Sequence, residues 1–391
     1  MSRKPIIDDI AIKKYAFFAK KISKNILFEK SPFSKAQCRK IKALSALLLS
    51  VFLIITQTAC SNMGGSGAEP VMKDGYYLDT ICSVTVYRMT GEDGTVKDAS
   101  DMSEEAEAAI DESFELCKDL ESKLSRTRED SDIGRINSAK GKWTEVSAET
   151  VELIQKGMEY SHISDGDFDI TVGGITKQWD FHAAEGEAKL PDEEALAEAV
   201  KHINYRNIAI EGNRVKLTDP ETELDLGGIA KGYIGDRMTE LLESKGVVSA
   251  VINLGGNVIC IGGKTDEDDF VIGVEAPFSD RSEIIGKVNA RDKTLVTSGI
   301  YERRIEVDGK TYHHILDTKT GWPVETDLDA VTLIADKGHS ADIDALSTTC
   351  LIKGSAEGME LIKNTDGIEG IFVLSNGDVR TTDGAAFEAA K

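Results

Sequence analysis

LDLGGIAKG, residues 224–232, is the stretch of sequence that decides the fold around it. An apolar extended segment ends at Gly227 and Gly228, where the backbone can approach a ligand closely because glycine carries no side chain. A helix that begins directly after the glycines presents free N–H groups, and Lys231 adds a positive charge, so the stretch suits a phosphate-containing ligand. The spacings of a Walker A loop and of the GxGxxG dinucleotide motif are absent. On its own, this pattern is more commonly a glycine turn leading into an ordinary helix.

Helical and strand patterns alternate irregularly along the rest of the chain. The spacing of apolar residues predicts helices over residues 101–124, 147–163, 229–244 and 344–363. A strand is expected over 77–87 and a strand pair over 249–262, with hairpins over 207–217 and at the turns Asp308-Gly309 and Asn376-Gly377. This order predicts an α+β fold with mixed or antiparallel sheets flanked by helices, and argues against a doubly wound parallel sheet. We find no repeat and no second linker, so we expect a single domain over residues 76–391.

Charge is distributed unevenly between the N-terminus and the body of the chain. Residues 1–59 contain 12 Lys/Arg and 3 Asp/Glu, a net of +9, and subtracting this from the whole-chain −22 leaves −31 on residues 60–391. A body this acidic repels nucleic acid, so binding to DNA or RNA is not expected. A basic pocket around Lys231 that binds an anionic ligand is compatible with this charge.

The N-terminus has the organisation of an export signal. A basic region precedes the apolar run ALSALLLSVFLII at 43–55, which is short for a spanning helix and typical of a signal peptide. Cys60 follows the small Ala59 and precedes a Gly/Ser-rich stretch, as in a bacterial lipoprotein cleavage site. We therefore expect lipidation at Cys60, a flexible tether over 60–75 and anchorage on the extracytoplasmic face of the cell membrane. An uncleaved signal anchor is the alternative, and it also places the body outside the cytoplasm.

Four further cysteines lie in apolar patterns without a C-x-x-C pair: Cys82, Cys117, Cys260 and Cys350. We expect buried free thiols, although an exported protein could form a disulfide.

Asp344 and Thr348 would share one face of the last predicted helix. A carboxylate and a hydroxyl at this spacing offer two oxygen ligands of the kind that Mg²⁺ prefers. The alternative is that Asp344 only caps its helix.

His314 stands at the end of a predicted strand, close to Asp317. A histidine beside a carboxylate can act as a general base. The alternative is a strand-end histidine bonded to the backbone. Similarly, the acidic residues around Phe168 could bond a polar heterocycle or merely form an Asx turn.

Seven segments, taken in this order, resemble the ApbE family of FAD:protein FMN transferases. They are LSRTREDSDIGRIN at 124–137, FDIT at 168–171, LDLGGIAKG at 224–232, INLGGN at 252–257, TSGIYER at 297–303, HILDTKTGWP at 314–323 and DALST at 344–348. Each segment alone is common, but all seven in family order are highly specific.

The resemblance implies an ApbE-like (T-fold-like) domain and a bacterial envelope enzyme that uses FAD as its substrate and Mg²⁺ as its cofactor. Such an enzyme cleaves the FAD pyrophosphate, attaches FMN to a Thr or Ser hydroxyl of a partner protein and releases AMP. The family suggests exported or membrane flavoproteins as acceptors, such as subunits of Rnf- or Nqr-type redox pumps. The resemblance also leaves an FAD pyrophosphatase open, in which water replaces the protein hydroxyl. A lipoprotein that only binds flavin would not need Asp344, Thr348 or His314.

Residue by residue, the resemblance implies three groups of site residues. His314 would be the base for the acceptor hydroxyl. The Mg²⁺ ligands would be the Gly228 carbonyl, Asp344, Ser347 and Thr348. The FAD site would contain Leu78, Thr127, Asp167, Phe168, Asp169, Asp225, Lys231 and Leu316. Thr127 stands where many relatives have an aromatic residue, so one stacking contact to the flavin would be missing.

Overall fold

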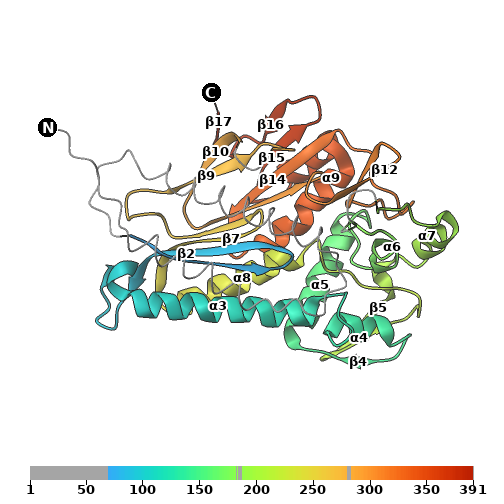
Figure 1. Cartoon of the computed structure of the whole chain (residues 1–391), viewed down its shortest axis with the longest axis horizontal. Coiled ribbons are helices and arrows are strands. Elements are labelled where there is room, and N and C mark those ends of the chain that lie inside the picture. The colour runs from blue at the N-terminus through green and yellow to red at the C-terminus, as the bar shows by residue number, and fades with distance from the viewer. Residues whose placement is uncertain (1–68, 182, 184–186, 280–282, 391) are drawn as a thin grey trace, which may run out of the picture. The chain divides into compact units, whose positions relative to one another are not determined.

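A nine-stranded sheet runs through the part of the chain that the computed structural model describes, residues 69–181, 183, 187–279 and 283–390. Its strand order is β1-β2-β7-β8-β11-β14-β15-β16, with β3 paired to β2, and all of these pairs are antiparallel (Figure 1). The strands are β1 (Val71–Tyr77), β2 (Thr80–Thr90), β3 (Val96–Asp98), β7 (Val247–Leu254), β8 (Asn257–Ile261), β11 (Lys293–Gly299), β14 (Leu328–Asp336), β15 (Glu369–Leu374) and β16 (Val379–Thr381).

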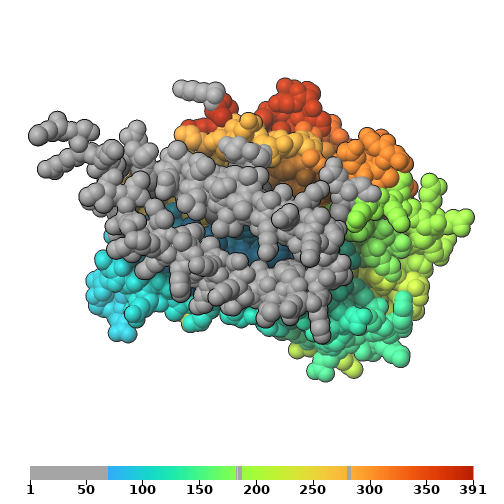
Figure 2. All heavy atoms as spheres, in the orientation of Figure 1, coloured from blue at the N-terminus to red at the C-terminus, as the bar shows by residue number. Residues whose placement is uncertain are grey.

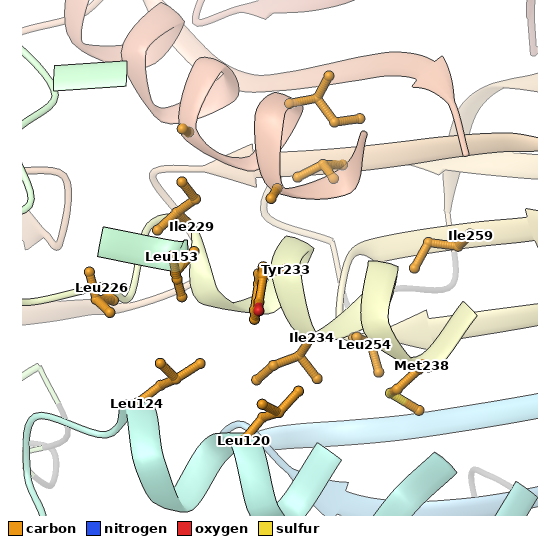
Figure 3. Close-up of a cluster of buried hydrophobic side chains, with 14 of the residues drawn as sticks. Leu120, Leu124, Leu153, Leu226, Ile229, Tyr233, Ile234, Met238, Leu254 and Ile259 are labelled. Atoms are coloured by element: carbon orange, nitrogen blue, oxygen red, sulfur yellow. The ribbon is translucent and has the colours of Figure 1, made fainter. Parts of the chain in front are cut away.

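Three long helices pack on one face of this sheet: α3 (Ser103–Leu124), α8 (Ala230–Ser244) and α9 (Ser340–Lys363). Figure 3 shows Leu120 of α3 facing Ile234 of α8, and Leu254 of the sheet beside Met238. Ile259 of the sheet packs against α8 at Gly235, where an added Cβ atom would lie 2.5 Å from Ile259 Cδ1. All five side chains are buried, so removal of apolar surface from water fixes α8, and with it the glycine turn, against the sheet.

A second, three-stranded sheet covers the opposite face. It is formed by β9 (Phe270–Glu275), β10 (Ile284–Ala290) and β17 (Phe387–Ala389), in the order β17-β10-β9. Phe270, Val274 and Val288 of this sheet share one buried cluster with Leu295 and Ile334 of the large sheet. The large sheet is therefore the middle layer between helices and a small sheet.

A smaller group of short elements carries the FDIT segment and joins the start of α8. Its helices and strands are α4 (Asp132–Ser138), β4 (Thr144–Glu145), α5 (Ala148–Ile163), α6 (Gly173–Thr176), α7 (Glu193–Val200), β5 (Ile208–Glu211) and β6 (Arg214–Leu217). The 3-10 turns η1 (Ala99–Met102) and η2 (Tyr205–Asn207) precede α3 and β5. In Figure 2 the orange surface of the hairpin β12 (Arg304–Val307)–β13 (Lys310–His313) adjoins the yellow-green surface of the α7 segment. Trp179, Leu196, Ile305 and Leu316 form the buried cluster beneath this contact.

The predicted α+β class with antiparallel sheets is confirmed, and so are the four helices and the three hairpin turns. The last helix begins at Ser340, before the predicted Asp344, and its backbone is non-helical at Gly354. The four cysteines of the body are buried free thiols, as expected.

The boundary of the tether and the first strand were predicted wrongly. Residues 71–75, expected in the tether, belong to β1, which pairs with β2 over its whole length. Asp74 and Gly75 are poor strand formers, but pairing with a buried neighbour outweighs that preference. The strand predicted over 77–87 is interrupted, because Leu78 and Asp79 form the hairpin turn with φ of 55° and 58°.

The export signal, Cys60 and the tether up to residue 68 lie outside the described residues. Within those that are described, no helix has the length and apolar character needed to span a bilayer.

Candidate active site

The LDLGG and FDIT segments lie side by side. The Asp225 N–H donates to the Ile170 carbonyl at 2.8 Å. Asn137 fixes the neighbouring residue, because its Oδ1 accepts from the Leu224 N–H at 2.7 Å and its Nδ2 donates to the Leu224 carbonyl at 3.0 Å. Three of the seven motifs thus meet at the entry to the glycine turn.

The Asp225 side chain holds the glycine turn through a hydrogen bond to its backbone. Its carboxylate accepts from the Gly227 N–H at 2.9 Å and from the Thr176 hydroxyl at 2.8 Å. Arg126 forms an ion pair with the same carboxylate at 2.8 Å. The predicted FAD-site residue therefore shapes the backbone that a ligand would meet.

Gly228 contacts two other predicted site residues. A Cβ atom added at Gly228 would lie 3.0 Å from Phe168 Cε2 and 3.8 Å from the Thr348 hydroxyl oxygen. A larger side chain at this position would push against the Phe168 ring. The structure thus brings Phe168, predicted for the flavin site, next to the predicted metal ligands Gly228 and Thr348.

A carboxylate on each of the helices α8 and α9 accepts hydrogen bonds from backbone N–H groups at the N-terminus of the other helix. Asp344 of α9 accepts from the Gly232 N–H of α8 at 2.8 Å, and Asp236 of α8 accepts from the Ser340 and Ala341 N–H groups of α9, each at 3.0 Å. Since α9 begins at Ser340, the alternative that Asp344 caps its own helix is wrong. Each carboxylate compensates the N-terminal N–H groups of the other helix.

Asp344 is a buried carboxylate, 3% exposed, with no ion-pair partner within 4 Å among the described residues. Burial raises its pKa, while the Lys231 charge, the Gly232 N–H and the Asn257 side chain oppose the rise. Its helical neighbour Ser347 lies 2.8 Å from Ser298 of β11 through their hydroxyls.

The oxygen donors at this point fit a hard cation. They are the carbonyl of Gly228, the carboxylate of Asp344 and the hydroxyls of Ser347 and Thr348, and Mg²⁺ prefers ligands of these kinds. A buried carboxylate without a cationic partner is costly, so its charge favours a bound cation. No cluster of three His, Cys, Asp or Glu side chains suited to a metal occurs among the described residues, so the site offers one carboxylate and neutral oxygens.

His314 lies directly after β13 and is held by the backbone of Arg303. The Arg303 carbonyl accepts from the His314 N–H and lies 3.1 Å from its Nδ1. A carbonyl can only accept, so Nδ1 carries the ring proton and Nε2 keeps its lone pair. Burial, the charge of Arg303, and weaker effects of His313 and Lys231 lower the pKa of His314 to about 3. The imidazole is therefore neutral near pH 7, as a proton acceptor must be.

A model of the ApbE family matches residues 78–372 of the chain. The chain belongs to the ApbE family. It is 30% identical to the FAD:protein FMN transferase of Treponema pallidum (strain Nichols), over 78% of this chain and 85% of the relative. It is 35% identical to an FAD:protein FMN transferase of Klebsiella pneumoniae (strain 342), over 70% of this chain and 84% of the relative.

Solved ApbE structures have the same fold. The ApbE protein of Thermotoga maritima superposes with a TM-score of 0.71 at 30% identity, covering 81% of this chain and 97% of the other. The Pseudomonas stutzeri flavinyl transferase ApbE in its apo form gives 0.67 at 28% identity, covering 82% and 96%. The family and fold predicted from the seven motifs are confirmed.

Three further residues predicted for the FAD site, Asp167, Asp169 and Leu316, are held by contacts within the fold. Asp167 pairs with Lys353 at 2.6 Å and Lys319 at 2.9 Å, and Asp169 accepts from the N–H groups of Thr171 and Tyr205. Both carboxylates are bonded within the fold, and they fix the turn that carries Phe168. Leu316 is buried in the cluster around Trp179.

Leu78 and Thr127 lie near α3. The Leu78 N–H donates to Glu121 Oε1 at 2.9 Å, and Asp79 pairs with Arg303 at 3.7 Å. Thr127 lines an open hollow of about 580 Å³ together with Glu121. The β1–β2 turn thus connects the α3 side of the site to the residue that holds His314.

Two residues with clear structural functions at this site were not assigned from the sequence. Asn137 ends one of the quoted motifs, and Asp236 lies five residues after Lys231 on α8. Their partners, Leu224 and the start of α9, become visible only in the fold.

Proposed function

We propose that this protein is a Mg²⁺-dependent FAD:protein FMN transferase. The observation that carries the proposal is the meeting of the LDLGGIAKG and DALST segments, which puts a glycine turn, Lys231 and the buried Asp344 at one point. The transferases named among the relatives support the same reaction.

The binding roles follow from the chemistry of the side chains. Lys231 supplies a fixed positive charge for the pyrophosphate of FAD, and Phe168 shapes the pocket next to Gly228. Gly228, Asp344, Ser347 and Thr348 would hold Mg²⁺, which would supply positive charge against the phosphates of FAD. The walls formed by Asp225, Asp167 and Asp169 keep this geometry fixed before substrate binds.

The proposed transfer is a substitution at the FMN phosphorus. The oxygen of the acceptor hydroxyl forms a bond to that phosphorus, and the bond from phosphorus to the bridging oxygen breaks. AMP leaves with the bridging oxygen and its electron pair. The hydroxyl proton goes to Nε2 of His314, the ring nitrogen that carries the lone pair.

His314 can act as the base although its pKa is low, because nearby positive charges are among the causes of the low pKa. The charges of Arg303 and Lys231 lower the pKa, and the negative charge of bound FAD offsets them. We therefore expect the basicity of His314 to rise when substrate binds.

The acceptor and the cellular location belong to the same proposal. We propose attachment to the extracytoplasmic face of the cell membrane through a lipid on Cys60, and exported flavoproteins such as Rnf- or Nqr-type subunits as acceptors. Replacing Cys60 by Ala should move the protein from the membrane fraction to the soluble fraction. An unchanged membrane fraction would favour an uncleaved anchor.

The reaction is tested with the purified protein, FAD, Mg²⁺ and a candidate acceptor domain. In-gel flavin fluorescence and peptide mass spectrometry should show FMN attached to a threonine or serine of the acceptor. An acceptor with that residue replaced by Ala is the matched control. AMP and free FMN without a labelled acceptor would instead identify a pyrophosphatase, and an absence of any FAD turnover would exclude both activities.

A further inference from the structure

Asn257, at the start of β8, has a buried amide side chain without hydrogen-bond partners among the described residues. It is 0% exposed, and neither its Oδ1 nor its Nδ2 has a hydrogen-bond partner within the described part of the chain. Leaving a buried amide unbonded costs folding free energy, and native proteins rarely keep such a group without a function.

The surroundings of Asn257 point to the cation site. Its strand β8 contacts α9, the helix that carries Asp344, and its cross-strand partner Val296 belongs to the buried cluster on that face of the sheet. Asn257 pairs with Val296 across the sheet, and two residues further along β11 the Ser298 hydroxyl meets Ser347. Asn257 thus approaches Asp344 from the sheet side.

We propose that Asn257 is a positioning residue for the divalent cation, a role that rests on the cation site of the proposed function. Its Nδ2 donates to the Asp344 carboxylate, and its Oδ1 accepts a hydrogen bond from a water molecule on the cation. Mg²⁺ in proteins usually keeps several waters, which supply the donors that the protein itself lacks here. Both orphaned amide atoms then have a partner, and the carboxylate is aimed at the cation.

A substitution at Asn257 should weaken cation binding without lowering the stability of the metal-free protein. Replacing Asn257 by Leu removes an unbonded amide and puts an apolar group of similar volume in its place. We expect the metal-free melting temperature to be unchanged or higher, because no hydrogen bond of the apoprotein is lost. We expect Mn²⁺ to bind about 10- to 100-fold more weakly, the usual effect of losing a residue that orients a metal ligand.

Asn207 provides the matched control. Its Nδ2 donates to the Thr222 hydroxyl at 3.0 Å, so its amide is bonded within the fold. Asn207→Leu should lower the melting temperature and leave the affinity for Mn²⁺ unchanged. Asn257→Asp, which keeps the shape and one acceptor oxygen, should bind Mn²⁺ more tightly than Asn257→Leu.

The experiment measures Mn²⁺ binding to the full-length protein in detergent by electron paramagnetic resonance, and the melting temperature with and without Mn²⁺. Weak binding by Asn257→Leu together with an undiminished metal-free melting temperature supports the proposal. Wild-type affinity for Mn²⁺ in Asn257→Leu overturns it, and so does a fall in the metal-free melting temperature, which would give the amide a structural role. If the wild-type protein itself does not bind Mn²⁺ while Asp344→Asn behaves identically, the cation site of the proposed function fails as well.

Discussion

At the scale of single residues, the site depends on charges that the fold itself leaves uncompensated. Asp344 is buried without an ion-pair partner in the described part of the chain, and Lys231 acts on it only from a distance. An ordinary core would replace or neutralise such a carboxylate, since an unpaired buried charge is unfavourable. Its position one helical turn before Thr348 supports the proposed cation site.

Replacing Asp344 by Asn removes the charge but keeps an acceptor for the Gly232 N–H. A metal that neutralises phosphate charge contributes several kcal/mol to the transition state, so we expect FAD turnover to fall about 10²- to 10³-fold. Because burial raises the pKa of Asp344 above its usual 3.8, the carboxyl stabilises the fold below pH 3.8, and this contribution is lost as the pH rises through the folded-state pKa. The metal-free variant should therefore melt at or above the wild-type temperature at pH 7. A melting temperature clearly lower than the wild type would contradict this reason for the loss of activity.

His314 gives a second, opposite pH dependence. Its pKa of about 3 lies below the usual 6.5, so its contribution to stability is present above pH 6.5 and is lost as the pH falls toward 3. His314→Gln should flatten the decline of the melting temperature between these pH values. Loss of the base should also lower FMN transfer about 10²- to 10⁴-fold. Equal pH profiles for variant and wild type would show that the His314 ring titrates normally.

The sequence indicated most of these residues but not how they are bonded. Gly228, Lys231, Asp344 and Thr348 were identified from motifs, and the structure brings Gly228 to Thr348 and Asp344 to the start of α8. The bonds of Asp225 to Thr176 and Arg126 were not predictable, because these partners come from other segments. The same holds for the bond of Asp169 to the Tyr205 N–H.

At the scale of elements, the site is built where two helices begin. The apolar spacing predicted α8 and α9 well, because their buried faces repeat with the helical period. The hydrogen bonds by which Asp236 and Asp344 each bond the N-terminus of the other helix were not predictable. Helix-capping rules describe residues that are near in sequence, whereas these partners belong to different helices. The tether boundary was predicted wrongly for another reason: residues 71–75 include poor strand formers, and they are ordered by pairing with β2.

Gly232 tests this close approach of the helices. A Cβ atom at Gly232 would lie 2.2 Å from the Ser340 carbonyl oxygen, so Gly232→Ala must separate the two N-termini. We expect a loss of about 1–3 kcal/mol in unfolding free energy and weaker Mg²⁺ dependence of FAD turnover, measured by denaturant titration and kinetics. Gly174→Ala is the control, because its Cβ would meet Ala199 Cβ at an ordinary 3.6 Å. Similar stability of the two variants would contradict the proposed tight packing.

At the scale of the whole molecule, the described residues form one unit in which the layered sheet supports the site. The described residues all fall within one compact unit. The α+β class followed from the sequence, but the order of strands did not, because β2 pairs with β7 and β11 with β8 and β14 over long stretches of chain. The acidic charge of the body excluded nucleic acid as an expected partner without any structure.

The chain shortened to residues 68–391 should fold and turn over FAD without the N-terminal segment. All site residues and all three buried clusters lie within it, so a single cooperative unfolding transition is expected by circular dichroism. FAD turnover within about twofold of the full-length protein would agree with this. Failure of the shortened chain to fold would show that the preceding residues complete the core.

The ratio of FMN attached to AMP released tests the central claim most directly. In one reaction with FAD, Mg²⁺ and an acceptor protein, attached FMN is counted from the intact mass of the acceptor and AMP is counted by chromatography. Transfer through His314 to an acceptor hydroxyl predicts a ratio close to one, with both products lost together in Asp344→Asn. A ratio close to zero, with AMP formed and FMN free in solution, would contradict the transferase account.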